Sequence, residues 1–258
     1  MQKFLASIGR AFLDFLSATG SLVNFALLAI WYGVRPPYYP RLILRQMVEI
    51  GYYSLPVVGL TALFTGMVLA LQTYTGFSRF AAESAIPNVV VLSVTRELGP
   101  VIAGLMVAGR IGAAIAAEIG TMRVTDQIDA LTTLSTNPYR YLVAPRLLAG
   151  LAMLPVLVLV ADIIGVFGGF LVSSYKLNFN PASYLQRTID FMQNKDVVAG
   201  LVKAAAFGFI VALMGCYNGY HSRGGAQGVG AATTYAVVSA SILILVFDYV
   251  LTEAFFAR

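Results

Sequence analysis

Charged residues are scarce in this chain. They make up 11% of its 258 residues, whereas 59% are hydrophobic, and the mean hydropathy is +0.79. An ordinary soluble domain carries about 25% charged residues, so this composition excludes one and indicates an integral membrane protein. Cysteine occurs once, as Cys216, which excludes an intrachain disulfide. We interpret Cys216 as a small buried hydrophobe.

Signatures of catalysis and of nucleotide binding are also missing. The single histidine, His221, has no serine or cysteine nucleophile motif near it, which argues against a hydrolytic triad. The run HSRGGAQGVG around it is rich in glycine but lacks the G-x-x-x-x-G-K-[ST] order of a phosphate-binding loop. No Cys-x-x-Cys pair or His-rich cluster indicates a metal. We therefore expect that the chain is not an enzyme and binds no metal or cofactor.

The basic residues are spread along the chain rather than clustered. The formal net charge is +5, but without a basic patch laced with aromatic residues it does not indicate nucleic-acid binding. Cytoplasmic segments of membrane proteins carry an excess of Lys and Arg, and this rule predicts a cytoplasmic N-terminus. The inner segments would then hold Lys3, Arg10, Arg35, Arg41, Arg45, Arg123, Arg140, Arg146 and Arg223, against Arg79, Lys176, Arg187, Lys195 and Arg258 outside.

Five long apolar runs predict the fold. They cover about residues 52–75, 87–119, 147–175, 197–217 and 231–255, and such runs can cross a hydrocarbon core about 30 Å thick. The second run would be about 50 Å long as a helix, so it must tilt, bend at Pro100 or protrude. The odd number of spans argues against inverted repeats. We predict an all-α integral membrane protein with five transmembrane helices in a single domain, residues 1–258.

Two segments outside the spans have the amphipathic pattern of helices that lie on a membrane surface. In the N-terminal region, 1–46, apolar residues between Phe4 and Leu16 alternate with Lys3, Arg10 and Asp14, which predicts an interfacial helix. Residues 22–34 are too few to cross a bilayer and are expected to continue in the interface. The segment 176–196 predicts a second amphipathic helix on the opposite, periplasmic side.

The run RELGPVIAGLMVAGRIGAAIAAEIGTMRVTDQIDAL, residues 96–131, places Arg96, Glu97, Arg110 and Glu118 in or beside a membrane span. Charge that faces lipid is costly, so these groups need another environment. Arg96 and Glu97 diverge by about 100° on a helix and cannot both face one partner. A role at a cavity and a structural role both stay open for this pair, whereas packing or a partner interface is favoured for Arg110 and Glu118.

A row of small residues runs along the same helix. Gly104, Ala108, Gly112, Ala116 and Gly120 recur at every fourth position, which lets another backbone approach closely. On the sequence alone, packing within one subunit and packing against a second copy are equally compatible with this row.

Two charges lie at matching depths in the last two spans. Lys203 is about two turns from the outer end of its span, and Asp248 is about two turns from the outer end of the next. This predicts a buried ion pair, which could be structural glue or a lipid-headgroup or proton site. Asp162, in the third span, receives no role.

The end of the 96–131 run, MRVTDQIDAL, has the pattern of a short amphipathic helix on the cytoplasmic side. A membrane subunit needs such an element if a separate soluble motor is to grip it, with an apolar stripe entering a groove.

The 96–131 run as a whole resembles the signature of the MlaE (YrbE) permeases. The resemblance extends over nearly the whole chain, including the amphipathic N-terminus, the NGY at 218–220 and the closing DYVLTEAFF at 248–256. It implies a membrane subunit of an ABC transporter that moves phospholipid between the inner and outer membranes of Gram-negative bacteria and helps maintain outer-membrane lipid asymmetry. The chain would lie in the inner membrane.

The partners that the resemblance implies are a second copy of the chain, two cytoplasmic ATPase subunits that bind ATP and Mg²⁺, a small STAS-domain protein and a periplasmic ring of MCE-domain protein. The segment 120–131 resembles the family's coupling helix. With Glu118 beside it, we expect Arg123, Asp126 and Asp129 to make polar contacts to the motor. Met122, Ile128 and Leu131 are the expected apolar anchors.

The resemblance also implies a lipid cavity between the two copies, lined by the first, second and fifth spans. Arg96 and Glu97 resemble the family's charged pair near that cavity, and Lys203 and Asp248 fall where the family carries polar groups. Candidate acyl-chain contacts are Leu69, Leu71, Tyr74 and Phe80, for which helix packing is an equally good interpretation.

Two functions of other classes compete with this one. An ion-coupled carrier would relay protons through Glu97 and Lys203 or Asp248 and would need no ATPase. A scaffold would only anchor the periplasmic protein. Neither the transport direction nor the lipid transported follows from the sequence, because an apolar cavity with a few charges admits several lipid classes.

Overall fold

The computed structural model describes residues 2–80 and 82–256, and within these ranges every regular element is a helix. The all-α prediction is therefore confirmed. Short π-helical segments occupy Val94–Leu98, Ala108–Gly112 and Tyr139–Val143, and 3-10 turns occupy Tyr52–Ser54, Ser78–Phe80 and Glu83–Ala85. The α-helices are α1 (Gln2–Val34), α2 (Pro40–Ile50), α3 (Leu55–Phe77), α4 (Ile86–Ser93), α5 (Gly99–Val107), α6 (Ala113–Val124), α7 (Gln127–Thr133), α8 (Ala144–Tyr175), α9 (Pro181–Phe191), α10 (Asn194–Tyr220) and α11 (Gly225–Phe256).

Six helical stretches of the described chain are long and apolar enough to cross a membrane, which makes this a multi-pass membrane protein. Five of them contain the five predicted spans, and the sixth lies in α1. The six are Phe12–Val34, Pro40–Phe77, Glu83–Val124, Tyr139–Tyr175, Asn194–Tyr220 and Gly225–Phe256.

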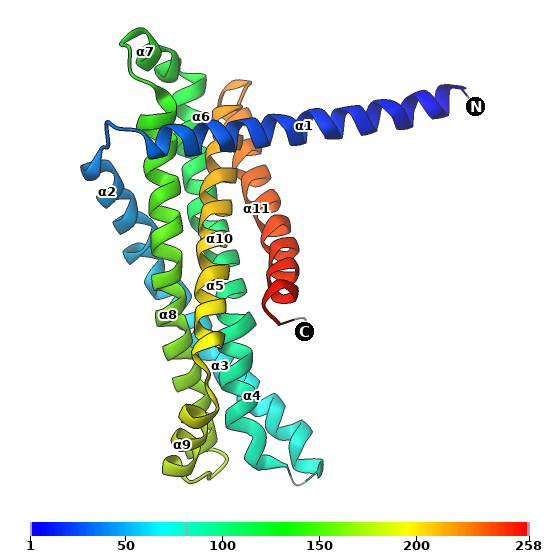
Figure 1. The fold of residues 1–258 in the computed structure, drawn as a ribbon, viewed down its shortest axis with the longest axis vertical. Helices are drawn as coiled ribbons and strands as arrows, with labels where there is room; N and C mark the ends of the chain where they lie inside the picture. Colours follow the sequence, from blue (N-terminus) through cyan, green and yellow to red (C-terminus); the bar gives the residue numbers. More distant parts are fainter. Residues whose placement is uncertain (1, 81, 257–258) are drawn as a thin grey trace.

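Helix α1 differs from the other long helices in its direction. It runs across one end of the bundle, whereas the others run along it (Figure 1). The sequence predicted an interfacial helix at the N-terminus with residues 22–34 continuing in the interface, and α1 covers both as one continuous helix of 33 residues. Phe25 anchors it, because its ring is 3% exposed and lies 5.3 Å from the ring of Tyr139 and 5.5 Å from that of Tyr217. This orientation favours the interfacial placement, so the count of five spans stays a prediction.

The second predicted span is longer than a bilayer requires, and the structure shows how the chain accommodates it. From Ile86 to Val124 the backbone stays helical, but π-helical segments interrupt it at Val94–Leu98 and Ala108–Gly112. Pro100 lies in the first turn of α5, a position that proline commonly occupies. The π segment Val94–Leu98 lies just before Pro100 and is a kind of local distortion common at functional sites.

Glycine contacts let the central helices approach closely. A Cβ added to Gly208 of α10 would lie 2.1 Å from the carbonyl oxygen of Gly150 in α8. The row from Gly104 to Gly120 packs in the same way within the subunit: Gly104 lies against Phe207 of α10 and Ile244 of α11. The structure therefore shows that this row packs within the subunit, a choice that the sequence left open.

The crossing of α3 and α8 gives a stability prediction. A Cβ at Gly66 would lie 1.9 Å from the carbonyl oxygen of Gly165, so Gly66→Ala must push two backbones apart. We expect it to cost about 1–3 kcal/mol and to lower the melting temperature of the purified protein by at least about 2 °C. Gly76→Ala is the matched control on the same helix, because nothing lies within 4 Å of its added Cβ. Equal melting temperatures for the two variants would contradict the assignment.

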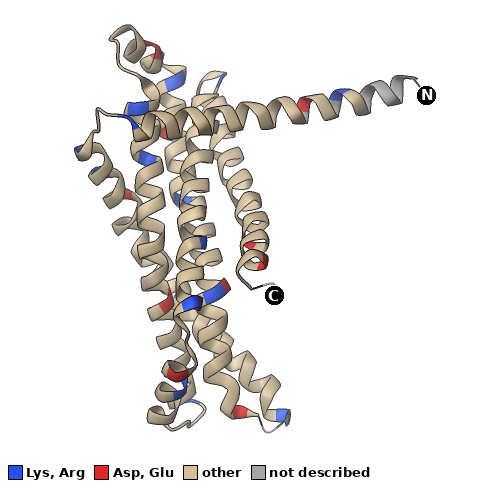
Figure 2. Cartoon of the chain, in the orientation of Figure 1, with Lys and Arg blue, Asp and Glu red and all other residues tan. Residues whose placement is uncertain are grey.

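Charged residues gather toward the two ends of the bundle, and a smaller group of both signs lies partway along it (Figure 2). Charge inside a membrane bundle is costly unless it is paired, and it commonly marks a functional site. This inner group is the candidate site.

Candidate functional site: a charged cluster inside the bundle

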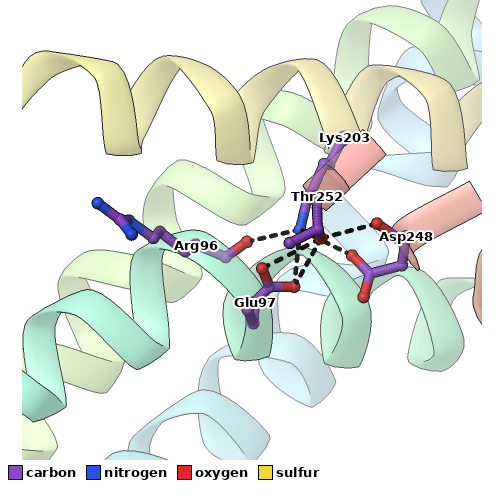
Figure 3. Close-up of polar contacts among 5 residues, drawn as sticks. All are labelled: Arg96, Glu97, Lys203, Asp248 and Thr252. Atoms are coloured by element: carbon purple, nitrogen blue, oxygen red, sulfur yellow. Dashed lines mark hydrogen bonds and ion pairs between the residues drawn. The ribbon is translucent and has the colours of Figure 1, made fainter. Parts of the chain in front are cut away.

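Lys203 of α10 is the centre of the cluster (Figure 3). Its side chain is completely buried, and its ammonium Nζ lies 2.7 Å from the Glu97 carboxylate and 2.9 Å from the Asp248 carboxylate. The same Nζ donates to the hydroxyl of Thr252 at 2.7 Å and to the backbone carbonyl of Arg96 at 3.1 Å. Four oxygen atoms from two other helical elements therefore surround one buried cation.

The local sequence explains why the Arg96 carbonyl is available to Lys203. An α-helical carbonyl normally accepts from the N–H four residues later, but position 100 is proline, which has no N–H. No donor can therefore come from that position, and the Nζ of Lys203 donates to this carbonyl. Helix α10 can come this close because Gly200 has no side chain: a Cβ there would lie 2.3 Å from the Thr95 carbonyl oxygen.

Arg96 makes a separate ion pair with α10, the helix that carries Lys203. Its Nη2 lies 2.7 Å from Oδ1 of Asp196, and its Nε donates to the same atom at 2.9 Å. Asp196 is 1% exposed and also accepts from the backbone N–H of Gln193, which caps the start of α10. The Arg96 and Glu97 side chains pair with different residues, as predicted, but both face the same helix. The two partners lie on α10, seven residues apart in the sequence.

The cluster has one more carboxylate than it has cations. Arg96 and Lys203 contribute +2, and Glu97, Asp196 and Asp248 contribute −3, which leaves a formal charge of −1. The side chain of Glu97 is 37% exposed and that of Asp248 is 20% exposed, whereas Lys203 is fully buried. The buried ammonium group of Lys203 therefore links α10 to α11 and to the π segment Val94–Leu98. The carboxylates of Glu97 and Asp248 are partly exposed, so they can contact a polar group that enters the bundle.

The ion pair predicted between Lys203 and Asp248 is confirmed. Sequence reasoning missed that Glu97 pairs with the same ammonium group and that Thr252 completes the cluster. Thr252 lies four residues after Asp248, hence on the same face of α11, and its hydroxyl donates to the Asp248 carbonyl at 2.7 Å. That spacing was the signal that could have identified it.

The remaining charges of the 96–131 run bind their own subunit. Arg110 donates to the Ser54 hydroxyl at 2.8 Å and to the Glu49 carbonyl at 3.2 Å. Glu118 lies 2.7 Å from Nη2 of Arg146, whose side chain is 5% exposed. These contacts agree with packing as the favoured role of Arg110 and Glu118. Glu118 is still 57% exposed, so its expected part in motor coupling stays a prediction.

The candidate acyl-chain contacts do not join the charged cluster. Leu69 and Tyr74 are half-buried and pack against a small core formed by Ala70, Ile86, Val90 and Val94, and the Tyr74 ring lies 6.1 Å from that of Phe179. Leu71 is half-buried on α3. The side chain of Phe80 lies outside the described part of the structure. Contact of these residues with lipid stays a prediction.

The segment predicted as one coupling helix is divided in two. Helix α6 ends at Val124, Asp126 adopts a left-handed backbone conformation with φ of 58°, and α7 begins at Gln127. Arg123 and Asp129 bridge the break with an ion pair of 2.7 Å. The single-helix prediction was wrong because apolar periodicity runs through a break that one residue at positive φ produces.

The apolar side of this segment also differs from the prediction. Ile128 is 1% exposed and belongs to the core of its own subunit, so it is not available as an anchor for a motor. Met122 and Leu131 are half-buried and pack against the same core. Leu134, just after α7, is 75% exposed. Leu134 was not among the anchors predicted from the sequence, although a leucine at the end of a short amphipathic segment was a visible signal.

The fold and the cluster define a class: a multi-pass helical membrane protein with ion pairs buried between its spans. The family described as Permease MlaE matches residues 43–254, and the chain belongs to that family. A "Probable ABC transporter permease protein" of Rickettsia felis is 58% identical over 97% of this chain and 96% of its own length. The "Intermembrane phospholipid transport system permease protein MlaE" of Haemophilus influenzae is 36% identical over 98% of both chains.

A plant relative is similar over a shorter stretch. "Protein TRIGALACTOSYLDIACYLGLYCEROL 1, chloroplastic" of Arabidopsis thaliana is 37% identical over 83% of this chain and 61% of its own length. The similarity thus extends to a protein whose name places it in chloroplasts.

Proposed function

We propose that this chain is the membrane-spanning permease subunit of an ABC transporter that moves phospholipid between the inner and outer membranes. The names of the Rickettsia and Haemophilus relatives support this proposal. The observation that carries it is the cluster at Lys203, which turns the partly exposed carboxylates of Glu97 and Asp248 outward at membrane depth. Such a site suits a substrate with a polar head and an apolar body.

The proposed assembly contains two copies of the chain and cytoplasmic ATPase subunits that bind ATP and Mg²⁺. A small STAS-domain protein and a periplasmic MCE-domain protein complete it. The chain would lie in the inner membrane of a Gram-negative bacterium with its N-terminus in the cytoplasm, and the activity would help maintain lipid asymmetry of the outer membrane.

The continuous helical path from Ile86 to Val124 supports a mechanism for coupling. ATP-driven approach of the motors would push together the two segments at α7, one from each copy. The chain stays helical from α6 through the π segment Ala108–Gly112 and α5 to the π segment Val94–Leu98. That movement would therefore reach Arg96 and Glu97 and narrow the cavity between the copies. The lipid would then move toward the periplasmic protein.

Reconstitution tests the function directly. The whole complex is placed in vesicles with fluorescent phospholipid, and transfer to acceptor vesicles is measured with ATP and Mg²⁺, without Mg²⁺, and with an imposed proton gradient alone. We expect transfer only when ATP, Mg²⁺ and the ATPase are all present. Transfer that follows the proton gradient without the ATPase would establish the carrier instead, and no transfer under any condition would favour the scaffold.

A further inference from the structure

A large apolar pocket lies on the side of α8 that faces α9, and it borders the charged cluster at Thr95 and Val197, the chain neighbours of Arg96 and Asp196. Its volume is about 540 Å³, within the range of about 300–1,000 Å³ typical of small-molecule sites. Figure 1 shows α9 beside the end of α8 that is far from α1 and α7. The lining residues are Val91, Thr95, Leu159, Asp162, Ile163, Val166, Phe167, Phe170, Tyr184, Leu185, Thr188, Ile189, Met192 and Val197.

The lining is suited to a hydrocarbon ligand rather than to a polar one. The hydroxyls of Thr95 and Thr188 already donate to backbone carbonyls four residues earlier, at 2.8 Å and 2.9 Å. Two buried polar atoms of the lining residues, the Tyr184 hydroxyl and Oδ1 of Asp162, have no hydrogen-bond partner. Asp162 is the only residue of the lining with a carboxyl group, and it is 7% exposed. Its Oδ1 lies against the backbone of α5, where a Cβ on Gly99 would meet it at 1.9 Å.

The exposed apolar side chains of α8 indicate how deep in the membrane the pocket lies. Exposed large apolar side chains extend along α8 from Leu148 to Phe167, about 29 Å at 1.5 Å per residue, which matches a hydrocarbon core about 30 Å thick. The pocket uses α8 from Leu159 to Phe170, about 17 Å. Of this length about 12 Å, from Leu159 to Phe167, lies in the half of the band nearer to α9, and the rest extends past the end of the band. The pocket is therefore about one leaflet deep.

This length distinguishes between two possible occupants. A membrane-spanning helix of a partner would need a hollow along the whole apolar band, whereas an acyl chain of the leaflet on the α9 side needs about half of it. Exposed apolar side chains on α9, such as Leu185 and Ile189, continue the lining to the membrane surface. We propose that this pocket binds one acyl chain of a membrane phospholipid, at a site that none of the charged side chains of the cluster lines.

The acyl chain in the pocket would fill the space between α8 and α9 and hold α9 in the plane of the membrane. The opposite surface of α9 is already fixed, because Nη1 of Arg187 donates to the Ser84 carbonyl before α4 at 3.0 Å. This site does not depend on the transport function, and its test measures binding rather than transfer.

The test uses the full-length protein with its natural partners in vesicles of phosphatidylethanolamine and phosphatidylglycerol. A small fraction of the phosphatidylethanolamine carries a photoreactive diazirine in one acyl chain, and cross-linked peptides are identified by mass spectrometry. We expect saturable labelling of the α8 and α9 residues that line the pocket. Ile163→Trp and Ile189→Trp place bulk in the pocket from two different helices, and each should lower this labelling at least about fivefold.

Both replaced residues are more than 60% exposed, so folding is expected to survive, and size-exclusion chromatography checks it. Val156→Trp is the matched control: Val156 is also exposed on α8 but does not line the pocket, and its labelling should equal that of the wild type. Labelling that rises linearly with probe content would mean contact with bulk lipid only. Such linear labelling would overturn the proposal. Labelling that neither tryptophan variant lowers, or labelling that appears only after the partner proteins are removed, would overturn it as well.

Discussion

Lys203→Met is expected to reduce phospholipid transfer by at least about tenfold in vesicles that contain the whole transporter. The substitution leaves the carboxylates of Glu97 and Asp248 without the cation that both contact. Removing one partner of a buried pair costs about 3–5 kcal/mol, and the partial exposure of both carboxylates places this case near the lower end. The measurements are the rate of lipid transfer and the melting temperature of the purified protein.

Two controls separate loss of function from loss of folding. Lys176→Met removes an exposed lysine beyond the end of α8 and should leave both measurements unchanged. The triple variant Lys203→Met, Glu97→Gln, Asp248→Asn removes the charges together and should restore most of the stability. If lipid transfer recovers along with stability, the cluster only stabilises the fold. If transfer stays low in a stable protein, the charges act on the lipid.

Leu134→Asp is expected to lower the amount of ATPase that co-purifies with the chain by at least about tenfold, because a buried apolar anchor at an interface contributes about 2 kcal/mol or more. Leu134 is 75% exposed at the end of the segment proposed to receive the motor. An aspartate there would have to be desolvated on binding. Quantitative immunoblotting after purification in detergent measures the effect, and lipid transfer should fall with it.

Neighbouring residues supply the controls for this prediction. Thr133→Asp adds the same charge at an exposed position one residue earlier and should have a smaller effect. Ile128→Ala opens a cavity in the subunit's own core and should cost about 2–5 kcal/mol of stability, without a specific loss of the ATPase at temperatures where the protein stays folded. Undiminished ATPase with Leu134→Asp would exclude Leu134 as the anchor.

The charged cluster shows how far sequence reasoning reaches into a site. The pairing of Lys203 with Asp248 was predictable because both lie the same number of turns from the outer ends of consecutive spans. The third member, Glu97, was identified as a site candidate but not as a partner of Lys203, because it is 106 residues away in the chain. The π segment that orients it carries no simple sequence signal, since its residues fit an α-helix equally well.

The coupling segment illustrates a different limit. Its amphipathic pattern was visible, but the pattern does not state whether the apolar side meets a partner or the subunit itself. Ile128 turned out to face inward and Leu134 outward. The short length of α7, together with the left-handed residue at Asp126, changes which side chains point away from the bundle.

The sequence by itself determined that this is a helical membrane protein, where its apolar spans lie and to which family it belongs. Those conclusions depend on composition, on the length of apolar runs and on motifs, which are local along the chain. Only the tertiary structure decided that the Gly104 to Gly120 row packs within the subunit and that Glu97 meets Lys203. In a soluble helix the apolar stripe marks the buried side, but in a membrane the side that faces lipid is apolar too. The rotation and depth of each helix, and hence its contacts, are therefore set by its neighbours.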